Sequence, residues 1–133
     1  MARDAEDLAN ELLAADIATR RAAAEKLNSL AEGASPAAVA LVNALADDDE
    51  SVRQLANSAL ESCGPPSQAA VDELEHLLTS ANADIAYWAA TLLGRLEAGA
   101  VQAVESLKTA AGEHPSDEVR KRATWALGKI ATG

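Results

Sequence analysis

Leucine returns along this chain at a fixed interval of 33 residues, in two interleaved series. The first series is Leu8, Leu41, Leu74 and Leu107; the second is Leu27, Leu60, Leu93 and Leu127, whose last step is 34 residues. Two series with one period indicate that the chain repeats a two-helix unit, because a fixed period of this size is typical of stacked solenoids. We therefore expect an all-α solenoid of antiparallel helix pairs.

Composition agrees with a helical chain and limits its partners. Apolar residues make up 49% of the 133 residues, with no Phe, and alanine, the strongest helix former, is abundant. The formal net charge is −10, from 21 acidic and 11 basic residues. This balance argues against nucleic acid and anionic membrane surfaces as partners, because both attract clustered Lys and Arg. A basic partner, or solubility alone, fits the charge better.

In each helix pair, we call the helix that carries the second leucine series the A helix and the other the B helix. Each A helix follows a residue whose side-chain oxygen can accept from the free N–H groups of the first turn; these are Asp16, Asp49, Asn82 and Ser116. Three A helices carry an arginine that we expect to reach caps or acidic loops of adjacent repeats, namely Arg20, Arg53 and Arg120. The expected helices, within one domain of residues 1–133, are about 2–14, 17–32, 35–46, 50–63, 66–80, 83–97, 99–112 and 116–131.

The last repeat carries the clearest family pattern. Residues 117–130 read DEVRKRATWALGKI, with Val119, Arg120, Ala123 and Leu127 at fixed spacings. This stretch resembles the HEAT-like repeats, in the short form found in phycocyanobilin lyases. The second and third repeats are similar in the same slots, and the first departs most, with Thr19 in the Val slot. The resemblance implies an α-solenoid that binds proteins.

No arrangement of residues typical of catalysis stands out in the sequence. Cys63 occupies the slot that other repeats fill with Leu or Ile, so we expect a buried structural residue rather than a reactive thiol. His76 shares a helix face with Asp72 and Glu73, where a solvated polar row is favoured over a weak metal site. Phosphate loops, Ser-His-Asp arrangements and Cys/His metal spacings are missing from the sequence. We therefore expect no enzyme, no cofactor and no metal site.

Acidic residues gather on the B helices, whereas most bases lie on the A helices. In HEAT-like solenoids the B helices line the concave face, so the resemblance implies an acidic concave surface. The side chains expected there change from repeat to repeat while the core slots do not, as recognition of an irregular partner requires. The B-helix residues predicted to contact a partner are Asp7, Asn10, Asn43, Asp72, Glu73, His76, Glu105 and Thr109. The alternative is an acidic face kept only for solubility.

Trp125 joins these predicted partner-binding residues. Its slot holds polar residues in the other repeats, which favours exposure, and tryptophan is enriched at binding hot spots. The alternative is that Trp125 covers the open end of the array, which has no following repeat. The same comparison of slots predicts a half-buried Trp88 and an exposed Tyr87.

The predicted function is a non-catalytic scaffold that binds a protein or peptide through the acidic B-helix face of a right-handed α-solenoid. Two alternatives stay open: a subunit or fragment of a bilin lyase or related pigment-handling protein, and a structural module that self-associates through the ends of the array. The N-terminus lacks the apolar core of a signal peptide, and no apolar run is long enough to span a bilayer. A cytoplasmic location is therefore expected.

Overall fold

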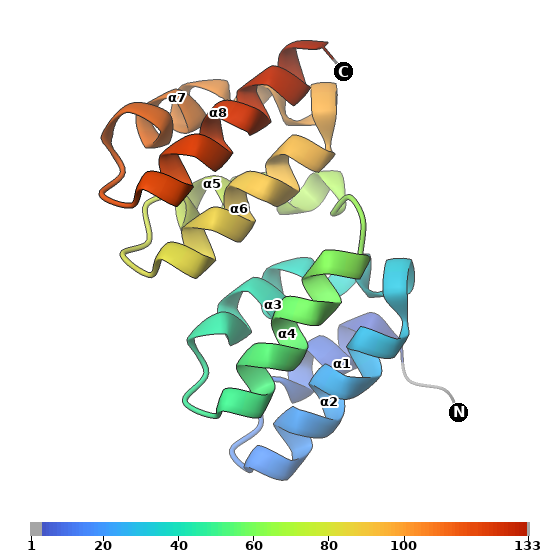
Figure 1. Ribbon diagram of the computed structural model, residues 1–133. Coiled ribbons are helices and arrows are strands. Elements are labelled where there is room, and N and C mark those ends of the chain that lie inside the picture. Colours follow the sequence, from blue (N-terminus) through green and yellow to red (C-terminus); the bar gives the residue numbers. More distant parts are fainter. Residues whose placement is uncertain (1–3, 133) are drawn as a thin grey trace. The chain divides into compact units, whose positions relative to one another are not determined.

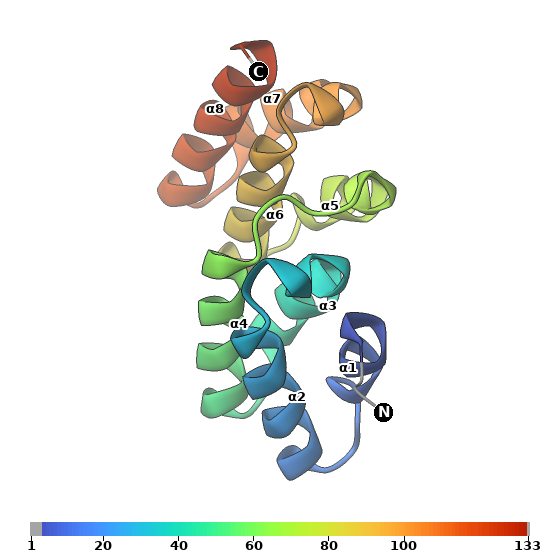
Figure 2. The ribbon, with the colours of Figure 1, turned by 90° about the vertical axis from the view of Figure 1, so that its right-hand side faces the viewer.

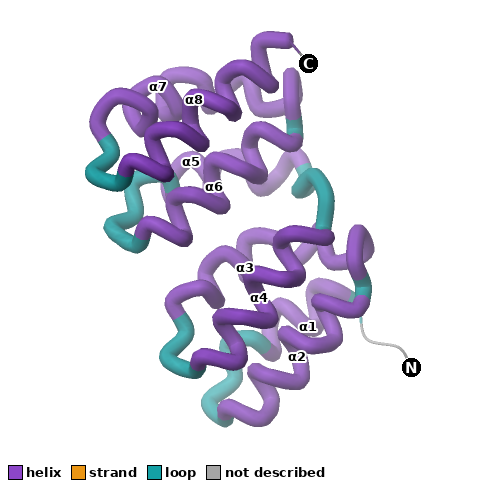
Figure 3. The backbone as a smooth tube through the Cα atoms, viewed as in Figure 1, coloured by secondary structure: helices purple, strands orange, loops and turns teal. Residues whose placement is uncertain are grey.

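The computed structural model of this protein describes residues 4–132, which form two compact units (Figures 1 and 3). The N-terminal unit runs to Gly64, and the C-terminal unit begins at Pro65. Each unit contains two helix pairs, and residues 4–132 include no β-strand. The all-α solenoid class predicted from the leucine period is therefore confirmed. The expected first helix begins at residue 2, and residues 2 and 3 lie outside the described part of the chain.

The A helices begin where their capping residues predict. They are α2 (Ile17–Ser29), α4 (Glu50–Ser62), α6 (Ala83–Arg95) and α8 (Asp117–Thr132). The Asp16 carboxylate accepts from the Thr19 N–H at 2.9 Å, and Asp49 accepts from the Val52 N–H at 3.0 Å. Asn82 accepts from two N–H groups of α6, and the Ser116 hydroxyl accepts from the Val119 N–H at 3.4 Å. All four predicted caps are confirmed.

The B helices are shorter than the sequence predicts. They are α1 (Ala5–Glu11), α3 (Ala38–Asn43), α5 (Val71–Leu77) and α7 (Val104–Glu113). Tighter 3₁₀ segments flank the last three, namely η1 (Ala31–Ala37), η2 (Ala44–Ala46), η3 (Gln68–Ala70) and η4 (Glu97–Ala103). No side-chain hydrogen bond caps α3, α5 or α7. Without a cap to fix the first α-helical turn, the chain enters these helices through i→i+3 turns.

A left-handed residue follows each of the first three A helices, again at the 33-residue period. These residues are Ala31, Gly64 and Glu97, with φ of 49°, 73° and 51°. A residue in this conformation ends an α-helix and turns the chain toward the next one. Only Gly64 is a glycine, so the other two turns carry the steric cost of a Cβ atom.

The core of each unit lies between its A and B layers. In the N-terminal unit α2 packs against α4, and Figure 2 shows α1 and α3 on one side of that pair. In the C-terminal unit α6 packs against α8, with α5 and α7 on one side. Seven of the eight periodic leucines are buried, and Leu127 is half-buried. The alanines Ala23, Ala56, Ala89 and Ala123 are buried too, where the small side chain lets neighbouring helices approach closely.

Candidate functional site

The predicted partner-binding residues of the C-terminal unit lie together on α5 and α7. The five exposed side chains that we call the α5–α7 surface are Asp72, Glu73, His76, Glu105 and Thr109. The side-chain amide of Gln102, in η4, donates to Asp72 Oδ1 at 2.6 Å. This bond holds the segment that leads into α7 against α5, so residues about 30 positions apart in the sequence share one surface.

The charge of the α5–α7 surface is acidic and mostly unpaired. On α5, Asp72, Glu73 and Glu75 form no ion pair within the described residues. On α7, Lys108 Nζ lies 3.3 Å from Glu105 Oε2, and both side chains are largely exposed. Such a pair contributes little to stability because water screens it. The surface is therefore able to attract a positively charged partner.

A groove of about 320 Å³ runs between α5 and α7, beside this surface. Its lining includes Glu75 of α5 and Leu78 directly after that helix, Ser106, Thr109, Ala110 and Glu113 of α7, and His114 and Pro115 of the loop that follows. Apolar side chains, hydroxyl groups and two carboxylates thus border one cavity. Thr109 belongs to both the groove and the α5–α7 surface, which makes the two continuous.

Glu75 is the unusual member of this groove. Its Oε1 atom is buried and has no hydrogen-bond partner among the described residues. A buried carboxylate oxygen without a donor costs free energy, because it has given up its water without replacement. In the B-helix alignment its slot holds Ala9, Val42 and Lys108, and Val42 is fully buried. A carboxylate therefore stands where the second repeat places a core residue.

His114 ties two loops of the C-terminal unit together at the groove. The Ser116 N–H donates to Nδ1 at 3.0 Å, so Nδ1 carries no proton and Nε2–H donates to the Ser80 carbonyl, also at 3.0 Å. The ring is buried, and no partner for it is evident in the sequence. Arg120 Nη1 donates to the His114 carbonyl at 2.7 Å. Arg120 thus holds the loop before its own helix, and the prediction that it reaches an adjacent repeat is wrong.

In the N-terminal unit, Arg20 confirms that prediction. Its guanidinium bonds the Ala14 and Ala15 carbonyls and lies 2.9 Å from Asp47 Oδ2 in the loop of the next repeat. Arg53 donates to the Asp47 carbonyl in the loop before its own helix.

Arg21 makes a second ion pair between the two repeats, 2.7 Å from Asp49 Oδ1. Its hydrogen bond is the main reason that the pKa of Asp49 falls to about 2, and the Val52 N–H lowers the pKa further. Asp49 therefore serves as a helix cap and as an inter-repeat ion-pair partner at once.

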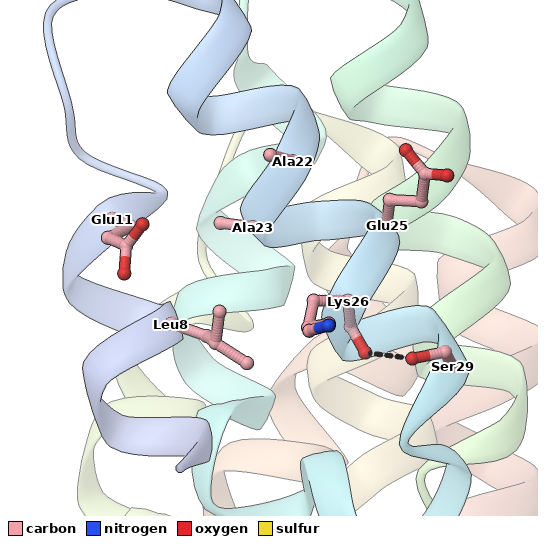
Figure 4. Close-up of a pocket in the computed structure, with 7 residues that line it drawn as sticks. All are labelled: Leu8, Glu11, Ala22, Ala23, Glu25, Lys26 and Ser29. Atoms are coloured by element: carbon pink, nitrogen blue, oxygen red, sulfur yellow. Dashed lines mark hydrogen bonds between the residues drawn. The ribbon is translucent and has the colours of Figure 1, made fainter. Parts of the chain in front are cut away.

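The predicted residues of the N-terminal unit are exposed, but they form a different surface. Asp7 and Asn10 lie on α1, and Asn43 ends α3, which carries no charged residue. A second groove, of about 450 Å³, lies between α1 and α2 (Figure 4). Leu8 points into it from α1, and Ala22, Ala23 and Lys26 line it from α2. Ser29 Oγ there donates to the Lys26 carbonyl at 2.7 Å.

Trp125 lies in the A-helix layer, apart from the B-helix residues with which it was grouped. A Cβ atom on Gly94 of α6 would come within 2.5 Å of its ring, so the two helices meet closely here. The Arg122 guanidinium lies 4.7 Å from the centres of both the Trp125 and Tyr87 rings and donates to the Tyr87 hydroxyl. Trp125 keeps 37% of its surface exposed. Tyr87 is half-buried and Trp88 buried, so both were predicted to be more exposed than they are.

Residues 71–132 match the family described as HEAT repeats. This match supports a HEAT-like repeat family. Three engineered proteins with crystal structures from the Northeast Structural Genomics Consortium are similar to the chain at 26% identity, with TM-scores of 0.55, 0.60 and 0.55. The alignments cover 99%, 99% and 97% of this chain and 64%, 65% and 38% of those proteins, so the chain spans less than two thirds of their length. No curated protein matches the sequence.

The match to HEAT repeats over residues 71–132 suggests a protein-interaction scaffold, because such repeats often mediate protein interactions. The match does not extend to the phycocyanobilin lyase type, which stays a prediction. Within residues 4–132, no three His, Cys, Asp or Glu side chains gather as a metal site would require. No helix of that part is long and apolar enough to cross a membrane. The Cys63 side chain is fully buried, as its slot in the repeat predicts.

Sequence reasoning missed several residues of this site. Glu75, Glu113, Gln102 and His114 were not among the predicted contacts, although they line the groove or hold its borders. For Glu75 a signal was present, because the alignment of the 33-residue repeats places it in a slot that is apolar in two other repeats. The contact of His114 with Ser80, 34 residues away, has no comparable signal in one sequence.

Proposed function

We propose that this protein is a non-catalytic interaction scaffold that binds a protein or peptide through its acidic B-helix face, with the α5–α7 surface as the main contact. The observation that carries the proposal is that five side chains chosen from the sequence pattern are exposed on two helices beside one groove. Neighbouring core positions are filled by buried leucines, so the surface can vary while the scaffold is kept.

The charge of this surface favours a basic partner. Asp72 and Glu73 are exposed, and Glu105 is only weakly neutralised by Lys108. Complementary charge speeds encounter and selects partners more than it raises affinity, and salt weakens it. Binding of the natural partner should therefore weaken as the salt concentration rises.

The experiment is affinity capture with the full chain, followed by calorimetry on the partner that is recovered. The test variant combines Asp72→Asn and Glu73→Gln, which removes two charges from the α5–α7 surface and keeps the side-chain shapes. The matched control combines Glu25→Gln and Glu61→Gln, two exposed acids of the A helices.

We expect the α5 variant to weaken binding of the partner by about tenfold, equivalent to about 1.4 kcal/mol, and the control to leave it nearly unchanged. If both variants weaken binding equally, only net charge matters and the proposed face is wrong. If binding depends on the A-helix acids alone, the proposal is likewise overturned.

A further inference from the structure

We infer that the groove between α5 and α7 receives an arginine side chain of the partner and that Glu75 is its acceptor. This inference rests on the proposed function, because it assigns the chemistry of one contact on the same face. It starts from the buried Oε1 atom of Glu75, which has no donor among the described residues. A partner that supplies an N–H group to this oxygen removes the cost of leaving it unsatisfied.

Several donors of this chain in or near the groove are already engaged. His114 Nε2 bonds the Ser80 carbonyl, and its Nδ1 accepts from Ser116. Lys108, the one base of α7, lies beside Glu105. Arg120 bonds the carbonyls of His114 and Pro115. None of these groups donates to Glu75, and the groove that Glu75 lines has room for a donor from a partner.

The lining of the groove favours arginine over lysine. Leu78 and Ala110 offer apolar surface for the methylene stem of the side chain. Glu75 and Glu113 place two carboxylates in the same groove, which suits a planar cation with five N–H donors. A guanidinium is also more weakly hydrated than an ammonium, so it loses less when it enters a partly buried site. Ser106 and Thr109 supply further oxygen acceptors.

The test is an NMR titration of the full ¹⁵N-labelled chain with the blocked peptide acetyl-Ala-Ala-Arg-Ala-Ala-amide. The control peptide carries citrulline in place of arginine, which keeps the shape and removes the charge. The test variant is Glu75→Gln. Its matched control is Glu73→Gln, which removes the same charge from an exposed position of the same helix. Far-UV circular dichroism checks that both variants fold.

We expect saturable shifts of the Glu75, Leu78 and Thr109 amides with the arginine peptide and much smaller shifts with citrulline. Glu75→Gln should lower the affinity for the arginine peptide by about tenfold, which corresponds to the loss of one hydrogen bond to a charged group. Glu73→Gln should change that affinity less than about twofold. Equal weakening by the two variants would show that overall charge alone attracts the peptide; the groove assignment then fails while the proposed face stands. The groove assignment is also overturned if the shifts of the groove amides are the same with the arginine and citrulline peptides, or if neither peptide shifts them.

Discussion

The two compact units use the same repeat pattern and join their repeats by different chemistry. In the N-terminal unit two ion pairs, Arg20 with Asp47 and Arg21 with Asp49, link one repeat to the loop of the next. In the C-terminal unit a neutral histidine bonds a carbonyl of the preceding loop, and Arg122 stacks between Tyr87 and Trp125. All three aromatic residues of the chain lie in this second unit.

The two units differ in which acidic side chains are held in contacts within the chain and which remain available to a partner. In the N-terminal unit, Asp47 and Asp49 are committed to arginines and to backbone N–H groups. In the C-terminal unit, Glu73 and Glu75 of α5 have no ion pair among the described residues. The first set of acids holds repeats together, and the second set is available to a partner. The 33-residue period determines which residues are in the core, whereas the side-chain contacts between repeats differ from one unit to the other.

The largest effect should come from breaking the stack of the C-terminal unit with Gly94→Ala. The added Cβ atom would meet the Trp125 ring at 2.5 Å and the Ala126 backbone at 3.1 Å, so α6 and α8 must move apart. We expect a loss of about 1–3 kcal/mol, as for other overpacked sites. Urea unfolding followed by tryptophan fluorescence measures it, because both tryptophans lie in this unit. Gly128→Ala is the control: nothing lies within 4 Å of its Cβ position, and it should stabilise α8 by about 0.5–1 kcal/mol.

Arg20→Ala should break the corresponding contact of the N-terminal unit. It removes a largely buried guanidinium from Asp47 and from two backbone carbonyls. We expect a loss of about 2 kcal/mol, because hydrogen bonds to charged groups are lost and their partners stay partly buried. Far-UV circular dichroism during denaturation measures it. The exposed Lys26→Ala on the same helix should stay within about 0.5 kcal/mol of the wild type, and an equal loss there would refute the role of Arg20.

Substituting glycine for the non-glycine residues at the left-handed turns should increase the stability of each unit by a different amount. Ala31→Gly should raise stability by up to about 1 kcal/mol, because the residue has a φ of 49° and Gly adopts this conformation without steric cost. In the C-terminal unit Glu97→Gly should gain less, since it also removes the Glu97 contact with Lys129 at 3.8 Å. Thermal unfolding provides the comparison. Gly64→Ala, with a φ of 73°, should destabilise; a neutral result there would contradict the explanation.

The smallest effect concerns pH and the N-terminal ion pairs. Asp49 has a folded pKa of about 2, below the unfolded value of about 3.9, so the folded state binds fewer protons between these values. The contribution of ionised Asp49 to the free energy of unfolding is complete above about pH 4 and is lost as pH falls toward 2. Arg21→Gln should flatten this part of the stability profile, because Arg21 is the main cause of the lowered pKa. NMR titration of the Asp49 carboxyl would show a pKa near 4 in that variant.

Sequence predicted the A helices more closely than the B helices for a physical reason. Asp16, Asp49 and Asn82 cap α2, α4 and α6, so each helix begins at the residue after its cap, as expected. The later B helices have no side-chain cap, and 3₁₀ turns extend them at one or both ends. Their borders depend on packing and backbone geometry that one sequence does not show.

The exposed side chains of the candidate site could be predicted from the sequence, whereas the groove could not. Exposure follows from the position of a residue on a helix that buries its leucines, and all nine predicted side chains are exposed. The groove depends on which side chains of α5 and α7 face each other, and on loops that meet across 34 residues. Trp125 shows the limit of slot comparison, because its contact with Gly94 depends on the close approach of two helices.

The most direct test of the proposed function is amide hydrogen exchange on the full chain, with and without the partner recovered by affinity capture. We expect the partner to slow exchange most strongly in α5 and α7, over residues 71–77 and 104–113, with smaller changes in α2 and α4. Slower exchange confined to the A helices, or to the N-terminal unit, would contradict the assignment of binding to the α5–α7 surface.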